Sequence, residues 1–161
     1  MAKTVERKEE TAEPDNKDRV DVRLMSPGKY EVTPEDVFEI DIYLSRRESR
    51  WVISEKGGKN ISHEKIIFRM WTYDEMIGLK KTATSYDQLR RLHMIDNDAL
   101  NRLKVQKLLT AWSFGKDNPR LKIHRQNGVL TDESWGAFTK LHPSICNYII
   151  DNMNAILEFN G

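Results

Sequence analysis

The side chains with the widest chemical use in this sequence are four histidines and one cysteine. The histidines, His63, His93, His124 and His142, lie singly, and none forms an HExxH pair or stands at metal-ligand spacing from the cysteine. With Cys146 as the single cysteine, no internal disulfide can form, and we expect a buried thiol in a reducing cytosol. These residues therefore predict no metal centre and no catalytic pair.

Motifs for nucleophilic catalysis and nucleotide binding are also absent from the sequence. It contains no GxSxG, no GxGxxG and no Walker motif. Gly57 and Gly58 resemble a glycine-rich phosphate-binding loop, but no helix start follows them. We therefore interpret Lys56–Asn60 as a turn. The acidic residues sit mostly at expected helix starts, where they complement the helix dipole. We therefore expect a protein that is not an enzyme, with no catalytic residue, no metal and no cofactor.

Charge and composition narrow the choice of partner. The chain has 161 residues and a formal net charge of +1, from 26 basic and 25 acidic residues. Dedicated nucleic-acid or membrane-surface proteins usually carry a clear basic excess. No apolar run approaches the ~18 residues that span a bilayer, and the N-terminus lacks the apolar core of a signal peptide. We expect a cytoplasmic protein without a membrane partner.

Basic residues in the middle of the chain form a candidate nucleic-acid surface. On one helix, Arg102 and Lys104 would point about 200° apart, so they make no single stripe. A solvated helix face is therefore the favoured interpretation. The residues concerned are Arg90, Arg91, Arg102, Lys104, Lys107 and the run Lys116–Arg125.

Helix signals dominate the second half of the chain. The segment Asn97–Phe114 has no Gly or Pro and is followed by Gly115, which predicts a central helix with a glycine C-cap. Its apolar side chains fall on two opposite faces, and this predicts packing against two neighbours. Capping boxes at Thr72–Glu75 and Ser85–Gln88 predict two shorter helices, the second running from Tyr86 to about Met94.

Two further helices are expected near the C-terminus. Thr131 is followed by two acidic residues and predicts a helix start, and Pro143 suits the first position of the last helix. The last helix carries one apolar stripe, which we interpret as core or, alternatively, as a ridge that faces a partner. The stripe consists of Ile145, Ile149, Met153 and Ile156.

Strand signals lie in the first half of the chain. Residues 38–44 alternate like a strand, whereas Thr33–Asp36 resembles a helix start, so we expect one helical turn followed by a strand. Arg50–Lys56 and Lys65–Trp71 are bulky apolar segments around a turn, and we expect them to pair as a β-hairpin. Residues 1–19 hold almost nothing apolar and predict a disordered tail, or an arm that orders on a partner.

Together these signals predict a mainly α protein: a small helical domain with an N-terminal β-hairpin and a disordered N-terminal tail. The expected boundaries are residues 1–19 for the tail and 20–161 for a single domain. Within that domain the hairpin covers about residues 50–71 and the helical core about residues 72–158. A chain of this length can bury a real core.

Large apolar residues of the helical core are the candidate contact residues. Tryptophan is more often a core residue than a contact residue, but it is also the type most enriched at binding hot spots. The candidate partner-binding residues are Trp112, Trp135, Phe138, Tyr148 and Met153.

Several short motifs follow one another in a suggestive order. They are the strand Lys65–Trp71, the helix start Thr72–Glu75, the stretch Leu109–Phe114 before a polar loop, Leu130–Glu133, and the Leu141–Pro143 step before an amphipathic helix. This order resembles the tail assembly chaperones of long-tailed bacteriophages and related prophages. The resemblance covers about residues 63–158 and does not account for the N-terminal region.

The resemblance implies a non-enzymatic, mostly helical protein in the cytoplasm of the infected host cell. Such a protein binds the tape measure protein, keeps that long apolar helix soluble and helps to recruit tail tube subunits, without remaining in the virion. The resemblance also implies self-association and a frameshifted longer partner in some members. Binding an apolar helix and keeping it soluble requires exposed apolar ridges in place of an active site.

Three other hypotheses stay open. A structural or connector protein of a phage particle would use the same surface as a permanent interface and would be present in purified virions. A nucleic-acid-binding regulator would lose affinity steeply as the salt concentration rises. An enzyme whose site escapes motif recognition is the least favoured hypothesis.

Overall fold

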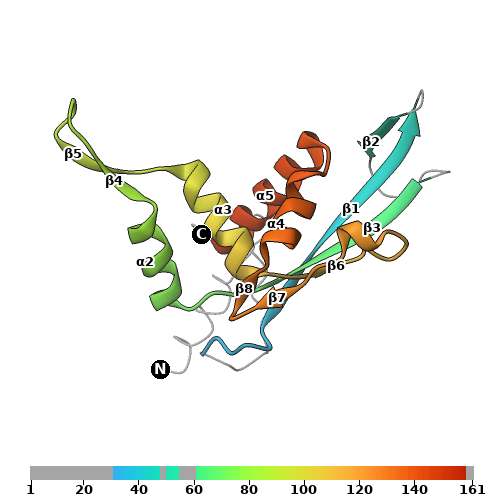
Figure 1. Cartoon of the computed structure of the whole chain (residues 1–161), viewed down its shortest axis with the longest axis horizontal. Helices are drawn as coiled ribbons and strands as arrows, with labels where there is room; N and C mark the ends of the chain where they lie inside the picture. Colours follow the sequence, from blue (N-terminus) through green and yellow to red (C-terminus); the bar gives the residue numbers. More distant parts are fainter. Residues whose placement is uncertain (1–30, 48–49, 55–60, 159–161) are drawn as a thin grey trace, which may run out of the picture.

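The computed structural model describes residues 31–47, 50–54 and 61–158, and in them the chain has a mixed α/β fold. These residues form four α-helices, one short 3-10 helix, a four-stranded antiparallel sheet and two separate two-stranded hairpins (Figure 1). The prediction of a mainly α protein is therefore wrong. The predicted tail at residues 1–19 and the predicted turn at Lys56–Asn60 lie outside the described residues.

The sheet has the strand order β2-β1-β3-β6. Its longest strand is β1 (Val37–Arg47), which pairs with β2 (Arg50–Ser54) on one side and with β3 (Ile61–Arg69) on the other. The fourth strand, β6 (Leu109–Trp112), pairs with β3. The expected hairpin within residues 50–71 is wrong, because β2 and β3 do not pair with each other. Each of them pairs with β1, which lies between them.

The alternation of β1 gives the sheet one apolar face. Phe38, Ile40, Ile42 and Leu44 are buried, and Phe38 stacks on Phe68 of β3 with 5.5 Å between the ring centroids. The helical turn expected before the strand is a tight turn instead: the amide of Asp36 donates to the Thr33 carbonyl at 3.0 Å. The strand was correctly favoured for this segment.

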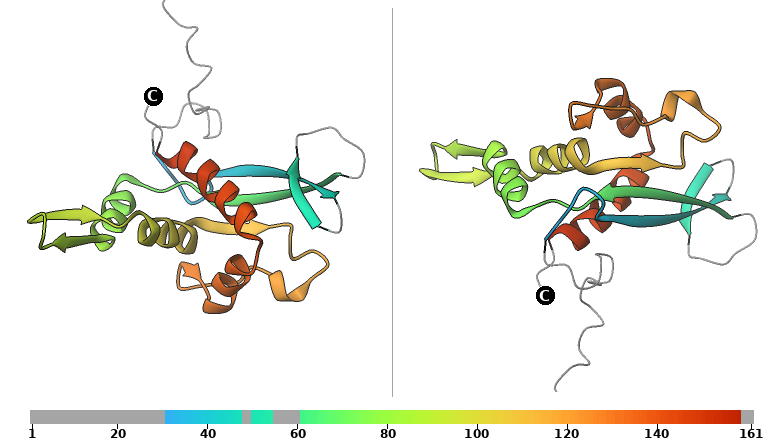
Figure 2. Two further views of the ribbon diagram at one scale, coloured as in Figure 1. Left: turned by 90° about the horizontal axis from the view of Figure 1, so that it is seen from above. Right: turned by 90° about the horizontal axis from the view of Figure 1, so that it is seen from below.

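Helices cover the apolar face of the sheet. Figure 2 shows α5 (Pro143–Leu157) lying across β1 and β3. Its stripe is a core stripe, since Ile145, Ile149 and Met153 are buried in the same cluster as the strand residues. Burying a large apolar side chain contributes about 1.5–3 kcal/mol, so the three buried side chains of this stripe stabilise the fold by several kcal/mol.

The central helix is shorter than the sequence predicts. α3 runs over Asn97–Leu108 and is capped by Asp96, and the chain then continues directly as β6. The prediction of a helix to Phe114 is wrong because the open edge of β3 offers hydrogen bonds that residues 109–112 take up. One of the two apolar faces predicted for this helix is therefore shared between α3 and β6.

Three predicted helix starts are confirmed. α2 (Tyr73–Thr82) begins with a complete capping box at Thr72, and α4 (Asp132–Thr139) is capped by Thr131. Pro143 is the first residue of α5. The loop before α4 holds η3 (Pro119–Leu121), β7 (Arg125–Gln126) and β8 (Val129–Leu130).

No helix in the described part of the chain has the length and apolar composition that a bilayer crossing requires.

A buried lysine ties α3 to the end of α5. Lys104 is only 2% exposed, and its Nζ donates to Asn154 Oδ1 at 2.7 Å and to Glu158 Oε1 at 2.9 Å. The ammonium also lies 5.2 Å from the centre of the Trp71 ring. Burial pushes the pKa of Glu158 up, but the hydrogen bond and charge of Lys104, together with Lys80, hold that pKa below its ordinary value.

Removing the Lys104 ammonium should destabilise the fold. We expect Lys104→Ala to lower the free energy of unfolding by about 2–3 kcal/mol, because Asn154 Oδ1 and Glu158 Oε1 lose the ammonium that donates to them. The half-exposed Lys107, one turn further on, provides the control: Lys107→Ala should cost less than about 0.5 kcal/mol. Urea denaturation measures both values, and equal losses would contradict this account.

Candidate functional site

A β-hairpin projects from the body of the molecule (Figure 1). β4 (Thr84–Asp87) pairs with β5 (Leu92–Ile95), with Thr84 opposite Ile95 and Asp87 opposite Leu92. We call Thr84–Ile95 the hairpin arm. It stands where the sequence predicts a helix from Tyr86 to about Met94, so that prediction is wrong.

The turn of the hairpin arm explains why the helix does not form. The Asp87 carboxylate accepts hydrogen bonds from the amides of Leu89 at 2.9 Å and Arg90 at 3.2 Å, which closes a turn. Arg91 then adopts φ 54°, a left-handed conformation that a right-handed helix cannot contain. The Ser85–Gln88 match to a capping box is therefore overridden by the local turn chemistry of Asp87.

The hairpin arm exposes apolar side chains on both of its faces. By their positions in the pairing, Tyr86 shares one face with Ile95, and Leu92 shares the other with Met94. A lone two-stranded hairpin is marginally stable in water, and clustered exposed apolar side chains are typical of binding surfaces. The exposed fractions are 53% for Tyr86, 96% for Leu89, 46% for Leu92, 36% for Met94 and 43% for Ile95.

The base of the hairpin arm is fixed to α2 and α3. The Thr84 hydroxyl donates to the Lys80 carbonyl at 2.7 Å, and the Asp96 amide donates to the carbonyl of the buried Ala83 at 2.9 Å. The arm is therefore held at its base, while its strands and turn are exposed or half-exposed.

The start of α2 is anchored by an ion pair. The Arg69 guanidinium donates to both carboxylate oxygens of Glu75, at 2.9 and 2.7 Å. These bonds, with a further one from the Thr72 amide, lower the pKa of Glu75 from 4.5 to about 2 against the effect of burial. The helix so anchored exposes Tyr73 and Ile77, which stand four residues apart.

The five candidate partner-binding residues lie in or against the core, not in the hairpin arm. Trp112, Trp135 and Phe138 form one aromatic cluster, in which Phe138 stacks on Trp135 at 5.4 Å and on Trp112 at 6.3 Å. Tyr148 is half-buried and its hydroxyl donates to the Asp41 carbonyl at 3.3 Å. Met153 is fully buried, so its side chain meets a partner only if the core opens.

Sequence reasoning missed the hairpin arm as a surface. Leu89, Leu92 and Ile95 have a spacing that also fits one face of a helix, which the sequence pattern would turn inward. Asp87 is the residue that could have indicated the hairpin, since an aspartate side chain that accepts hydrogen bonds from nearby backbone amides favours a turn over a helix.

Three of the five reactive side chains have structural partners. His63 shares a 2.7 Å hydrogen bond with Asp41, and the His142 ring accepts from the Ser144 amide at the start of α5. The Cys146 thiol donates to the Phe138 carbonyl at 3.3 Å, and burial raises the pKa of that thiol, which keeps it protonated. In the residues that the structure describes, no three His, Cys, Asp or Glu side chains gather in a way that could hold a metal ion.

The fold and the surface define a mixed α/β protein in which an antiparallel sheet carries helices on one face and an apolar hairpin arm projects from one end. No family model, no curated protein and no solved structure matches the chain. Its function must therefore be argued from its own residues.

The Glu75 ion pair predicts a pH dependence. Because the pKa of Glu75 is lower in the folded protein than in the unfolded chain, its stabilisation is complete above about pH 4.5 and is lost as the pH falls toward 2. We expect Glu75→Gln to reduce the loss of unfolding free energy between pH 5 and pH 2.5 by about 1–2 kcal/mol, after allowance for solvent screening. Urea denaturation at the two pH values measures the loss. The exposed Glu35→Gln is the control and should keep the wild-type dependence; identical behaviour of the two variants would refute the role of the pair.

Proposed function

We propose that this protein is a non-catalytic tail assembly chaperone, which binds the tape measure protein and helps to recruit tail tube subunits. Two things support the proposal. One is the resemblance in motif order over about residues 63–158. The other, which carries most of the argument, is the hairpin arm with its uncovered apolar side chains.

The hairpin arm suits an apolar helix as its partner. Full burial of a large apolar side chain contributes about 1.5–3 kcal/mol, so several such side chains together can offset the ~4–15 kcal/mol that association costs. Both faces of the arm offer such side chains, and an amphipathic helix presents a matching apolar ridge. Among partners that present such an apolar ridge, the resemblance implies the tape measure protein.

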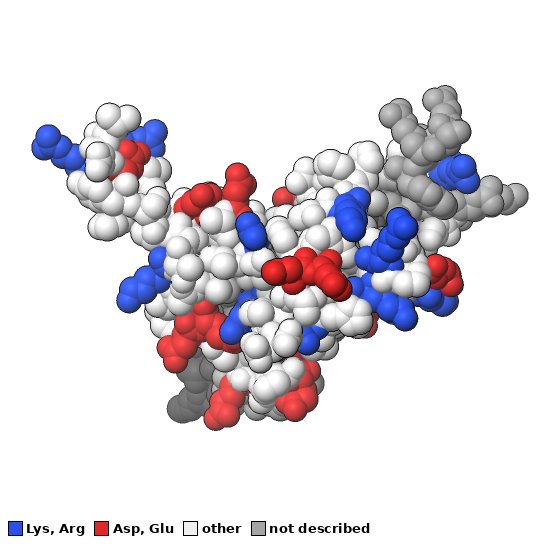
Figure 3. Space-filling model, viewed as in Figure 1, with Lys and Arg blue, Asp and Glu red and all other residues white. Residues whose placement is uncertain are grey.

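The charges of the hairpin arm add a preference for acidic flanks on the partner. Arg90 and Arg91 stand in its turn, and Figure 3 shows basic side chains at this end of the molecule. Arg90 is paired only loosely with Asp87, at 3.9 Å. Carboxylates beside the apolar ridge of a partner helix would therefore meet basic groups, which favours correct pairing and rapid association.

The strongly held charges elsewhere in the molecule have a structural explanation. Lowered carboxyl pKa values belong to Glu75 and Glu158, each of which pairs with a basic side chain between two elements of the fold. Perturbed pKa values at structural pairs have an explanation that needs no reaction.

Two basic residues of the candidate nucleic-acid surface have structural roles. Lys104 is buried, and the Arg125 guanidinium donates to the backbone carbonyls of Lys107, Leu109 and Gly128. These contacts leave the hypothesis of a nucleic-acid-binding regulator with less support than that of a protein-binding chaperone.

Co-expression tests the proposed function. A coiled-coil segment of a tape measure protein should gain severalfold in soluble yield when this protein is co-expressed, because its apolar ridge is covered. The triple variant Leu89→Ser, Leu92→Ser, Met94→Ser should return the yield to the level without chaperone. Its own fold should change by less than about 1 kcal/mol, since these side chains are exposed.

The control for the triple variant is Val129→Ser, which removes an exposed apolar side chain from β8, outside the hairpin arm. It should support solubility as the wild type does. Unchanged solubility of every tape measure segment in the presence of the wild-type protein would remove the main support for a chaperone.

Purified virions separate the chaperone from the connector hypothesis. A chaperone leaves the assembled tail, so quantitative mass spectrometry of virions should detect less than one copy per particle. A fixed stoichiometric copy number would instead favour a permanent structural role of the same surface.

A further inference from the structure

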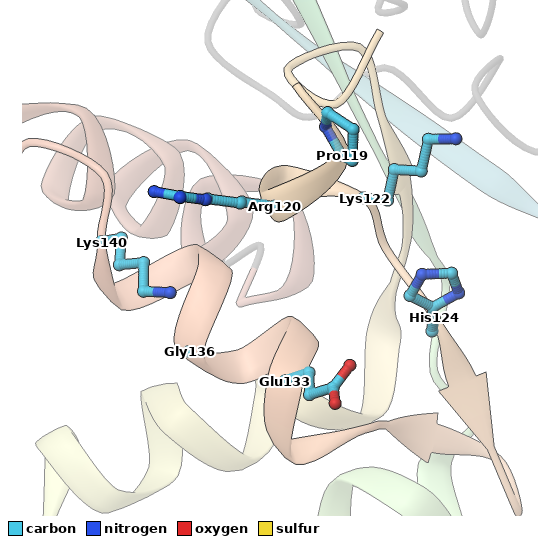
Figure 4. A pocket seen from close by; sticks show the side chains of 7 residues that line it. All are labelled: Pro119, Arg120, Lys122, His124, Glu133, Gly136 and Lys140. Carbon is cyan, nitrogen blue, oxygen red and sulfur yellow. The ribbon is translucent and has the colours of Figure 1, made fainter. Parts of the chain in front are cut away.

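A cavity of about 290 Å³ lies between η3, the segment that follows it, and one side of α4 (Figure 4). Its charged side chains are Arg120, Lys122, Glu133 and Lys140, and His124 stands beside them. In Figure 4, Arg120 reaches from η3 and Lys140 from the end of α4 toward the same space. Neither the hairpin arm nor the five candidate contact residues contribute to this cavity.

Three cations and one carboxylate line the cavity, and in Figure 4 the Lys122 ammonium points away from Arg120 and Lys140. Across the described ranges, Arg120, Lys122 and Lys140 form no ion pair, whereas Arg69 and Lys104 are matched to carboxylates. Figure 3 also shows basic side chains gathered toward the end of the molecule opposite the hairpin arm. The unpaired positive charge produces a local potential that attracts an anionic group.

The walls of the cavity are held by buried hydrogen bonds. Ser134 of α4 is fully buried; its hydroxyl accepts from the His124 amide at 2.6 Å and donates to the Lys122 carbonyl at 3.4 Å. The Trp112 indole N–H donates to the Leu121 carbonyl on the other side of the same segment. The backbone that carries the cations is therefore fixed to the core, which lowers the entropic cost of binding.

A close backbone approach holds the same segment in place. A Cβ on Gly115 would lie 2.9 Å from both the Leu121 carbonyl oxygen and the Lys122 Cα. Only glycine therefore allows the backbone at position 115 to approach the backbone of Leu121 and Lys122 this closely. Together with the Ser134 and Trp112 bonds, this contact makes the cavity a formed feature of the loop between β6 and α4.

We propose that this cavity binds the carboxylates of an acidic segment of a partner polypeptide. Arg120 and Lys140 suit carboxylates that enter from solvent, and Arg in particular can hold a carboxylate with two parallel hydrogen bonds. None of the lining residues is Phe, Tyr or Trp, on which nucleic-acid bases stack, so the cavity lacks the stacking platform of a single-strand nucleic-acid site. The proposal does not depend on the partner of the hairpin arm.

Fluorescence anisotropy of the full-length protein with a labelled peptide of ten glutamates tests the proposal. We expect saturable binding that Arg120→Glu and Lys140→Glu each weaken about fivefold. The matched control is Lys81→Glu, a reversal of the same charge on the exposed surface of α2, which should change affinity less than twofold. Glu133→Gln should strengthen binding two- to threefold, an effect opposite in sign that damage to the fold would not produce.

Three results would overturn the proposal. They are no binding to the wild type, equal weakening by Lys81→Glu, and tighter binding of a single-stranded oligothymidylate through Arg120 and Lys140. The last result would assign the cavity to nucleic acid. Circular dichroism of each variant verifies that the fold is retained, and the Glu133→Gln result decides the matter if a charge reversal unfolds the protein.

Discussion

The apolar face of the β1–β3 pair is the constraint on which the rest of the structure depends. Two long antiparallel strands present Phe38, Ile42, Ile66 and Phe68 on one side, and that side must be removed from water. α5 lies across it with a continuous apolar stripe, and the second half of α3 adds Val105 and Leu108. The same sheet takes residues 109–112 as its fourth strand, which ends the central helix.

This arrangement leaves the hairpin arm without a core to join. Its base is fixed to α2 and α3, but the apolar side chains of β5 have water as their neighbour. At the other end of the molecule, an equally well anchored loop carries unpaired positive charge. Under the two proposals, one surface would take an apolar helix and the other an acidic segment.

The sequence predicted those elements whose signals are local. Side-chain caps at Thr72 and Thr131, proline at position 143 and the alternation of β1 each depend on neighbouring residues, and all are confirmed. Two of the failures, the length of the central helix and the pairing of the strands, involve partners distant in the chain. No residue near position 109 indicates that one edge of β3 is open for pairing. No residue near position 50 indicates that β1 lies between β2 and β3. The hairpin arm was missed for a different, local reason: its apolar spacing fits a helix, and only Asp87 and the left-handed Arg91 redirect the chain.

The central claim is that the hairpin arm is the surface that a partner covers. Hydrogen exchange of the backbone amides, measured with and without a co-purified tape measure coiled-coil segment, tests it most directly. The account predicts that amides of residues 84–95 exchange more slowly in the complex, while those of β1 and α5 are unchanged. Protection that spares residues 84–95 and falls on another surface would contradict it.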